Sequence, residues 1–488
     1  MRSFESRGRS VAAKFAELNG DGRIDLFVVA LNGIPPEEER MIGVYLQRAD
    51  GELPAIPDHR IQVPRWSTVY DVADVRTDLP GEELIVLQPD GVTLLSLASA
   101  DAPQIKLLAP GPTSVGLADD ERGFEPYRLI DRSFGDEPWI LVPQIGQLTA
   151  LSPTGEVRAR IAVPRRANYF IIPETGMVTI ESDFQIFLDV PRLAVGDVNG
   201  DGAVDFVSST RHEIRIFHRR EDGGYDYQPS EVLPLRRVTP RDHIRGSGGV
   251  ASDSRDIDGD GKLDLVVAHV RGSFSDATTS VYIHMNKGSG WDLETPDQTL
   301  VTKGSLGSAS LVDLNGDGVS ELLRLGVSFS LLELVELLLT KELDVEISVH
   351  HYDPFAETGR DGLGGFREKP SMKKKIEIPF SFETFRPRGF IPVANVDVNA
   401  DGYLDFISSG GGRAIHVMLG GESGLFDQRG GRQKMVTAGV IHCADYNLDG
   451  LPDFVIFDPH NFDVPIRIGI NRGALPGTPP RLVAQPES

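Results

Sequence analysis

A nine-residue acidic loop recurs six times in this chain of 488 residues and constrains its fold more than any other feature. Each copy, such as "DVNGDGAVD" at residues 197–205, has an oxygen-bearing side chain at its first, third, fifth and ninth positions. Carboxylates this close repel one another unless a positive charge lies between them. Alternating side-chain oxygens, with the carbonyl oxygen of the seventh residue, are the ligands that calcium prefers. The repeated loop therefore predicts about six calcium sites.

The glycine at the sixth position of every copy permits the sharp bend that turns the ligands inward. The predicted ligands, with the carbonyl donor fourth in each group of five, are Glu17, Asn19, Asp21, Arg23 and Asp25; Asp197, Asn199, Asp201, Ala203 and Asp205; Asp256, Asp258, Asp260, Lys262 and Asp264; Asp313, Asn315, Asp317, Val319 and Glu321; Asp397, Asn399, Asp401, Tyr403 and Asp405; and Asp445, Asn447, Asp449, Leu451 and Asp453.

An EF-hand loop begins with a similar pattern, but it needs a bidentate Glu at its twelfth position and a helix on each side. The segments that flank the second copy, "RLAVG" and "VDFVSS", are short and rich in β-branched residues, which indicates strands. The twelfth position also lacks the required acid, because it holds Val28, Ser208, Val267, Arg324, Ser408 and Ile456 in the six copies. The pattern excludes the EF-hand.

A nine-residue acidic loop between two strands resembles the FG-GAP or VCBS-type repeat of integrin-like β-propellers. The loops carry this resemblance, whereas the Phe-Gly and Gly-Ala-Pro signatures of the integrin version are missing. The resemblance covers nearly the whole chain and implies an all-β propeller, residues 1–488, as a single domain. It also implies that each loop joins the innermost strand of a blade to the second strand. It says little about function.

Two degenerate copies fill the gap between the first and second loops, at residues 72–87 and 129–142. In the first of these, Arg76 takes the third position and its guanidinium supplies a positive charge; in the second, Trp139 takes the ninth position. We expect neither to hold a metal. Eight units of about sixty residues result, and each fits a four-stranded blade. They start near residues 10, 67, 124, 190, 249, 306, 389 and 438.

The last unit is the thinnest, because only "RLVAQ" near the C-terminus remains as its fourth strand. Residues near the N-terminus would then complete the ring, and seven blades plus an irregular unit are the alternative architecture. In the fourth unit, the pattern predicts strands near 191–197, 203–209, 212–217 and 230–234.

Two segments interrupt the repeat. Residues 167–187 are expected to form a hairpin that turns at 174–176, and the second insertion, 326–380, contains a leucine-rich helix at 330–343 and a basic stretch at 366–380. In the family, connections from second to third strands and from blade to blade lie opposite the calcium loops, so both insertions are expected there. The helix either packs on its own propeller, buried on most sides, or docks a partner protein or membrane. The basic stretch is equally explained as a solvated strand edge.

The same face is expected to gather residues that precede innermost strands, as an anion- or glycan-binding face or as ordinary rim arginines. These residues are Arg65, Trp66, Arg165, Arg166, Tyr169, Phe170, Arg241, Arg245, Phe385, Arg386 and Arg388.

The formal net charge of −23 argues against a nucleic-acid partner. Much of this charge is local, since the six loops hold 19 carboxylates. Cys443 lies in an apolar stretch and is expected to pack in the core. Neither a transmembrane segment nor a signal peptide is visible in the sequence. Because weak calcium loops need millimolar calcium, we expect an extracellular, cell-surface or periplasmic location, with a leader removed.

Three functions stay open. The first is a non-catalytic binding, adhesion or assembly module for a protein or glycan partner. The alternative is a polysaccharide-active, lyase-like enzyme, because some lyases are built on similar calcium-containing propellers; the third is a structural subunit of a surface assembly. Recognised nucleophile, zinc-protease and phosphate-loop motifs are absent and the 11 histidines are scattered, which favours a module without catalytic residues.

We predict that calcium titration of the metal-free protein will give a stoichiometry of about six, because six loops carry the full ligand pattern. Isothermal titration calorimetry measures this directly. A stoichiometry of one or two would contradict the ligand assignment.

Overall fold

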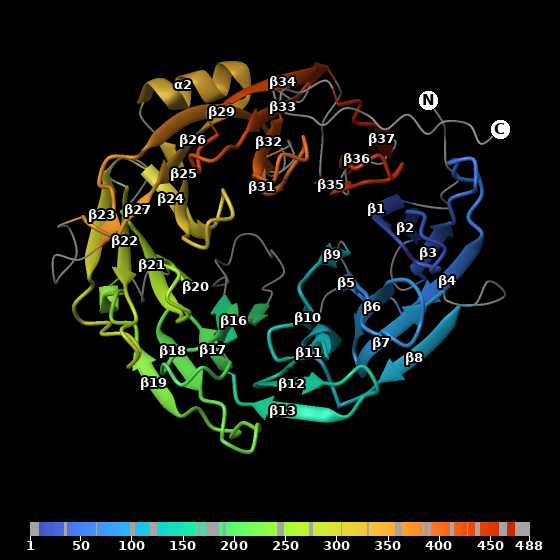
Figure 1. The fold of residues 1–488 in the computed structure, drawn as a ribbon, viewed down its shortest axis with the longest axis horizontal. Coiled ribbons are helices and arrows are strands. Elements are labelled where there is room, and N and C mark those ends of the chain that lie inside the picture. Colours follow the sequence, from blue (N-terminus) through green and yellow to red (C-terminus); the bar gives the residue numbers. More distant parts are fainter. Residues whose placement is uncertain are drawn as a thin grey trace, which may run out of the picture.

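The computed structural model describes residues 9–33, 37–64, 66–97, 103–117, 124–135, 137–163, 167–170, 185–188, 192–241, 248–272, 277–303, 305–328, 331–356, 364–381, 386–387, 392–409, 414–426, 428–434, 440–457 and 466–473. Within these ranges the regular secondary structure is almost entirely β-strand, and the sheets stand around a central axis like the blades of a propeller (Figure 1). Eight blades are present, which confirms the predicted fold class and blade number.

The first three blades follow one another in chain order, and each is a meander of antiparallel strands. Blade 1 contains β1 (Arg9–Ala16), β2 (Asp25–Asn32), β3 (Glu39–Tyr45) and β4 (His59–Val63). Blade 2 contains β5 (Val69–Ala73), β6 (Glu83–Gln88), β7 (Gly91–Ser96) and β8 (Gln104–Leu108). The short 3-10 helix η1 (Ser114–Leu117) and the strand β9 (Glu125–Pro126) follow, and β9 pairs in parallel with β5. Blade 3 contains β10 (Ile130–Asp131), β11 (Trp139–Gln144), β12 (Gln147–Leu151) and β13 (Val157–Ile161).

A two-stranded hairpin of β14 (Ala167–Phe170) and β15 (Gln185–Leu188) precedes blade 4. Blade 4 contains β16 (Arg192–Gly196), β17 (Asp205–Ser209), β18 (Glu213–Phe217) and β19 (Glu231–Pro234), close to the four predicted ranges. Blade 5 contains β20 (Gly249–Arg255), β21 (Asp264–Arg271), β22 (Thr278–His284) and β23 (Gln298–Lys303).

Blade 6 is the most elaborate of the eight. Its four blade strands are β24 (Ser305–Val312), β25 (Glu321–Ser328), β26 (Glu342–His350) and β29 (Met372–Ser381). The short strand β30 (Arg386–Pro387) pairs with β29, and helix α2 (Leu331–Thr340) lies between β25 and β26. A small hairpin of β27 (Tyr352–Asp353) and β28 (Gly365–Phe366) lies between β26 and β29 in the chain. Blade 7 contains β31 (Val393–Val396), β32 (Asp405–Ser409), β33 (Ala414–Leu419) and β34 (Gln428–Lys434). The described part of blade 8 contains β35 (Val440–Ala444), β36 (Asp453–Phe457) and β37 (Arg467–Gly469).

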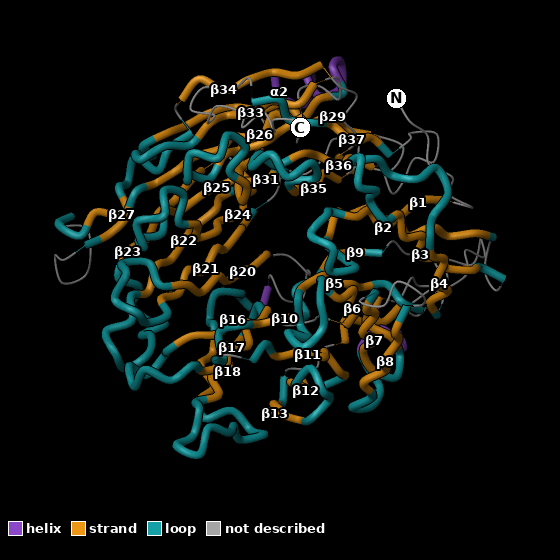
Figure 2. Tube along the Cα trace, turned by 45° about the vertical axis from the view of Figure 1, so that its right-hand side comes forward, coloured by secondary structure: helices purple, strands orange, loops and turns teal. Residues whose placement is uncertain are grey.

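The burial of the strands follows their place in a blade. Second strands such as β2 ("DLFVVALN") and β36 ("DFVIF") are buried on both faces, because neighbouring blades cover them. Outer strands such as β4 and β13 alternate between buried and exposed residues, because one side of the rim meets solvent. Figures 1 and 2 show the first strands nearest the axis and the fourth strands at the rim. The core is therefore a series of apolar layers between blades.

The ring closes where blade 8 packs on blade 1 (Figure 1). The Phe15 and Tyr446 rings stack with their centroids 5.0 Å apart, and Val455 and Phe457 join the same core cluster. The Tyr446 hydroxyl donates to the Gly51 carbonyl at 2.9 Å. The expected fourth strand of blade 8 and the residues before Arg9 lie outside the described residues. Closure of the described part thus uses the packing of blade faces.

The second insertion is smaller than predicted. A helix is present, but β26 and β29 are the third and fourth strands of blade 6, so residues 342–350 and 372–381 belong to the ring. In β29, Lys373 and Lys375 are exposed at 58% and 57%, while Ile376 and Ile378 are buried. The basic stretch is therefore a solvated strand edge. The rest of the insertion, β27 and β28, follows a third strand and so lies at the end of the ring that carries the acidic loops.

Helix α2 lies in the connection from the second to the third strand, and therefore opposite the acidic loops, as predicted. It stands at the rim of the ring (Figure 1). Leu337 is buried, but Leu338 and Leu339 are 58% and 80% exposed. The expectation of a helix buried on most sides is therefore wrong for this last turn. At ten residues α2 is too short to cross a bilayer, and none of the described helices has the length and hydropathy of a membrane span.

The innermost strand β35 carries two partly buried titratable groups, His442 and Cys443. Burial raises the pKa of the Cys443 thiol to about 12, in keeping with the predicted packing role. Burial also lowers the pKa of His442 to about 4, and the nearby Lys14 adds to this effect. The His442 ring lies against Phe457, with centroids 6.0 Å apart.

We expect His442 to make the fold acid-sensitive. The folded state keeps this imidazole neutral, whereas the unfolded chain binds a proton below its ordinary pKa of 6.5, so stability falls as the pH drops from 6.5 towards 4. The loss reaches about 3 kcal/mol for a shift of this size. Urea denaturation across this range should show a weaker pH dependence for His442→Gln. His59→Gln on the outer strand β4 serves as control, and an unchanged pH dependence in His442→Gln would contradict the assignment.

Candidate metal centres

All six acidic loops join the first strand of a blade to the second and therefore lie at one end of the ring. They follow β1, β16, β20, β24, β31 and β35. Strands flank every loop, which confirms the rejection of the EF-hand. The loops of the blades are thus held in one repeating position by the sheets behind them.

Two residues of each loop have a left-handed backbone. The sixth residue is glycine in every copy, for example Gly202 with φ of 79°. The fourth residue has the same conformation, and there Ala400 and Leu448 take it with φ of 57° each. Non-glycine residues in this region carry strain. The glycine at the sixth position predicts its bend, whereas the bend at the fourth position is visible only in the structure.

The first carboxylate organises the turn. In the second loop, Asp197 accepts the backbone N–H of Gly200 at 2.6 Å and of Gly202 at 2.8 Å. Asp256 does the same in the third loop, with Gly259 at 2.8 Å and Gly261 at 2.7 Å. The loops are therefore wrapped around their first acid by backbone hydrogen bonds.

The third loop brings three carboxylates together. Oxygens of Asp256, Asp258 and Asp260 all lie within 4.8 Å of one another. Burial raises the pKa of Asp258, and the charges of Asp260 and Asp256 raise it further. An all-oxygen donor set with this excess of negative charge fits a hard divalent cation such as calcium.

The ninth residue of the loop is not part of that exposed cluster. Asp264 is only 1% exposed and lies beneath the loop, where one oxygen accepts the N–H of Ile257 at 2.8 Å. Its other oxygen accepts the N–H of Asn286, just after the third strand, at 2.6 Å. Equivalent donors in other blades are Leu18 and Gln47 to Asp25, Val198 and Arg219 to Asp205, and Val398 and Gly420 to Asp405. The ninth acid thus joins the loop, the second strand and the end of the third strand.

These buried acids are poised to respond to a cation. Burial raises the pKa of Asp264 to about 8, while hydrogen bonds from Asn286 and Ile257 lower it in part and the charges of Asp258 and Asp260 raise it. Burial likewise raises the pKa of Asp25 and Glu321 to about 7, and of Asp405 and Asp453 to about 6. A bound cation would favour the ionised forms.

Asp453 adds an independent observation. Its side chain is fully buried, and one carboxylate oxygen, Oδ2, has no hydrogen-bond partner among the described atoms. The charges of Asp449 and Asp445 in the same loop raise its pKa. A buried carboxylate oxygen without a donor is costly unless a cation contacts it. The residues of this loop therefore fit a metal ion as well.

The two degenerate loops differ, because blade 2 keeps a buried acid whereas blade 3 has Trp139 at the ninth position. The Arg76 guanidinium binds Asp78 through two hydrogen bonds of 3.0 and 2.6 Å, in the place where a cation would lie. Glu83 nevertheless accepts the N–H groups of Val75 at 2.9 Å and Arg76 at 3.1 Å, like the ninth acid elsewhere. In blade 3, Trp139 is buried and stacks on Phe134 with centroids 4.1 Å apart.

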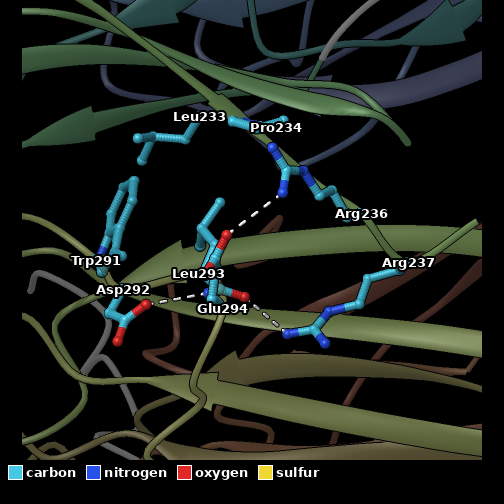
Figure 3. A pocket seen from close by; sticks show the side chains of 8 residues that line it. All are labelled: Leu233, Pro234, Arg236, Arg237, Trp291, Asp292, Leu293 and Glu294. Atoms are coloured by element: carbon cyan, nitrogen blue, oxygen red, sulfur yellow. Dashed lines mark hydrogen bonds and ion pairs between the residues drawn. The ribbon is translucent and has the colours of Figure 1, made fainter.

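A pocket of about 340 Å³ lies between the outer strand of blade 4 and the β22–β23 connection of blade 5 (Figure 3). Leu233, Trp291 and Leu293 supply its apolar lining. Arg236 and Glu294 form an ion pair of 3.4 Å at its side, and the Arg237 guanidinium donates to the Leu293 carbonyl at 3.0 Å. The pocket thus combines an apolar lining with two cations, Arg236 and Arg237, and two acids, Asp292 and Glu294.

The predicted basic and aromatic face falls mostly outside the described residues. Arg65, Arg165, Arg166, Arg245, Phe385 and Arg388 lie there, as does the expected turn at 174–176. Trp66 and Arg241 are exposed. The face therefore stays a prediction.

Comparison with known proteins bears on the repeat and the fold. Residues 256–323 match the model of the FG-GAP-like repeat. The curated proteins gave no significant match. Among solved structures, an Agrocybe aegerita lectin that recognises non-reducing terminal N-acetylglucosamine is 14% identical, with a TM-score of 0.36, covering 76% of this chain and 85% of the lectin. The V. cholerae biofilm matrix protein Bap1 is 12% identical, with a TM-score of 0.26, covering 98% of this chain and 83% of Bap1. At these scores neither likeness carries an argument about function.

Two substitutions in one loop should distinguish the contribution of the buried acid to stability from that of the exposed acids. Asp264→Asn leaves a backbone N–H facing an amide N–H, which costs about 2 kcal/mol even in chelator. Asp260→Asn, on an exposed residue, should change stability in chelator by less than about 0.5 kcal/mol and reduce only the gain that calcium gives. Chemical denaturation with and without calcium measures both. Equal losses of unfolding free energy in chelator would show that the two acids contribute equally to the metal-free fold, which would contradict this prediction.

Proposed function

We propose, for an eight-bladed β-propeller that carries an FG-GAP-like repeat, a calcium-stabilised binding module that acts outside the cell on a protein or glycan partner. The observation that carries the proposal is the set of six equivalent acidic loops at one end of the ring. The clustered oxygens of Asp256, Asp258 and Asp260 give the clearest single site.

The first effect of calcium would be to stabilise the fold. Each loop bends around its first acid and places further oxygens beside it, so an uncompensated loop repels itself. An ion that binds the folded loops and not the unfolded chain stabilises the fold by mass action, about 2.7 kcal/mol for each site at a hundredfold excess over its Kd.

An exterior location follows from the same chemistry. The fifth ligands Asp201 and Asp260 lie on exposed turns, and open loops of this kind bind calcium weakly, in the range found outside cells. A rigid ring with variable connections is a common platform for recognition. The pocket beside Arg236, Trp291 and Glu294 offers one place where a polar group of a partner would bind.

We expect a calcium chelator to lower the melting temperature by about 10 °C or more, because several sites of this strength would be emptied at once. Differential scanning calorimetry with EGTA, and with calcium restored, measures the change. Magnesium serves as the control ion, because it dehydrates reluctantly and demands stricter geometry. An unchanged melting curve in chelator would contradict a calcium-stabilised propeller.

The binding role needs its own test. Labelled protein should bind the outer surface of cells of its source in calcium and should be released by EGTA. Pretreatment of the cells with protease or with glycosidases separates a protein partner from a glycan. Equal surface binding by a thermally unfolded sample would overturn the binding role without affecting the stability result.

A further inference from the structure

Three blades carry a side-chain amide just after the third strand, at Gln47, Asn286 and Asn471. The backbone N–H of each residue donates to the ninth acid of the loop in its own blade. These bonds run from Gln47 to Asp25 at 2.9 Å, from Asn286 to Asp264 at 2.6 Å and from Asn471 to Asp453 at 2.6 Å.

The side-chain amide of the same residue reaches the preceding blade. Asn286 donates to the Val198 carbonyl at 2.7 Å, and Asn471 donates to the Val398 carbonyl at 2.7 Å. Across the closure of the ring, Gln47 donates to the Tyr446 carbonyl at 2.9 Å. In all three cases the acceptor is the second residue of the preceding acidic loop. Each of these amides therefore holds two loops in adjacent blades.

The path continues inside the preceding loop. The N–H of Val198 donates to Asp205 at 3.1 Å, and the N–H of Val398 donates to Asp405 at 2.6 Å. A continuous series of hydrogen bonds thus leads from Asp264 through Asn286 and Val198 to Asp205. It joins the buried acid of one loop to the buried acid of the next.

Backbone hydrogen bonds join neighbouring loops as well. The eighth residue of a loop donates its N–H to a carbonyl of the loop before it, from Leu263 to Asp197 at 2.8 Å, from Ser320 to Ile257 at 2.9 Å and from Leu404 to Leu314 at 3.0 Å. The loops therefore form a connected belt. Side chains add to this belt, through the three amides and through the Ser320 hydroxyl, which donates to the Asp256 carbonyl at 3.0 Å.

Blade 7 supplies a natural contrast. Gly420 makes the same backbone bond to Asp405, at 2.8 Å, but has no side chain to reach the preceding loop. The backbone contact with the ninth acid is thus kept without the amide, so the amide contact is a separate feature.

We propose that Gln47, Asn286 and Asn471 are positioning residues that couple the calcium loops of neighbouring blades, so that occupation of one loop raises the calcium affinity of the next. The proposal rests on the proposed calcium sites. An ion fixes the turn that contains the accepting carbonyl, and a fixed carbonyl holds the amide residue and, through its backbone N–H, the ninth acid of the next loop. Binding of a second ion in the next loop then costs less conformational entropy.

The test uses the second and third loops, because Trp291 reports on the third. Its indole N–H donates to the Leu263 carbonyl at 2.8 Å, at the eighth position of that loop, and the ring is buried. The chain has 3 tryptophans, so Trp66→Phe and Trp139→Phe leave Trp291 as the only emitter in the full-length parent. Calcium is then titrated into the metal-free protein while Trp291 fluorescence is followed.

Asp201→Asn empties the second loop, and we expect it to raise the calcium midpoint of the Trp291 signal about fivefold in the parent. In an Asn286→Ala background, which keeps the Leu263–Asp197 backbone bond, the same substitution should shift the midpoint by less than twofold. Asn286→Gln keeps an amide on a longer stem, as Gln47 has, and should retain the coupling.

Gln298→Ala is the matched control. Gln298 is also a buried amide between blades, bonded to the Phe366 carbonyl at 2.6 Å and to its N–H at 2.7 Å, but it touches none of the loops. The fivefold shift should survive this substitution. Asn471→Ala, studied by calorimetric titration with Asp401→Asn, repeats the test at the seventh and eighth blades if Asn286→Ala folds poorly.

The coupling role of the amide is overturned if Asp201→Asn leaves the parent midpoint unchanged, or if the full fivefold shift persists in Asn286→Ala. Both outcomes leave the calcium sites themselves in place. The absence of any calcium-dependent transition in the parent would instead overturn the proposed function, and the coupling with it.

Discussion

The buried carboxylate at the ninth loop position is the contact on which the rest of the structure depends. It accepts one N–H from the second residue of its loop and another from the chain just after the third strand, as Asp264 does with Ile257 and Asn286. A buried carboxylate is tolerated only when such donors satisfy it. Because the donors come from separate segments, this one side chain sets the position of the loop relative to two strands.

The degenerate loop of blade 2 shows that this contact serves the fold and not only a metal. Its exposed ligands have been replaced by the Arg76–Asp78 ion pair, yet Glu83 still accepts two backbone N–H groups. The exposed acids of the other loops have no comparable backbone role between segments. The loop therefore combines a structural acid, which blade 2 keeps without the full set of exposed ligands, with a set of exposed oxygens that suits calcium.

The same contacts carry from blade to blade and close the ring. Gln47 binds the Tyr446 carbonyl between blades 1 and 8 as Asn286 binds the Val198 carbonyl between blades 5 and 4. In repeat proteins, stability depends on such nearest-neighbour interfaces as much as on the repeats themselves. The described part of the closure therefore uses an interface that the repeat already contains.

The sequence by itself determined the strand–loop–strand unit, the eight blades and the presence of a leucine-rich helix, because these follow from short-range patterns such as the glycine at the sixth position and the apolar second strands. Calcium, too, is a prediction from local chemistry. Only the tertiary structure decided which acids are buried, how far the second insertion extends and which amides join neighbouring loops. Gln47 and Tyr446 are 399 residues apart in the chain, and Asn286 and Val198 are 88 apart. No local pattern specifies such pairs, because the hydrogen bond exists only after the blades have packed side by side.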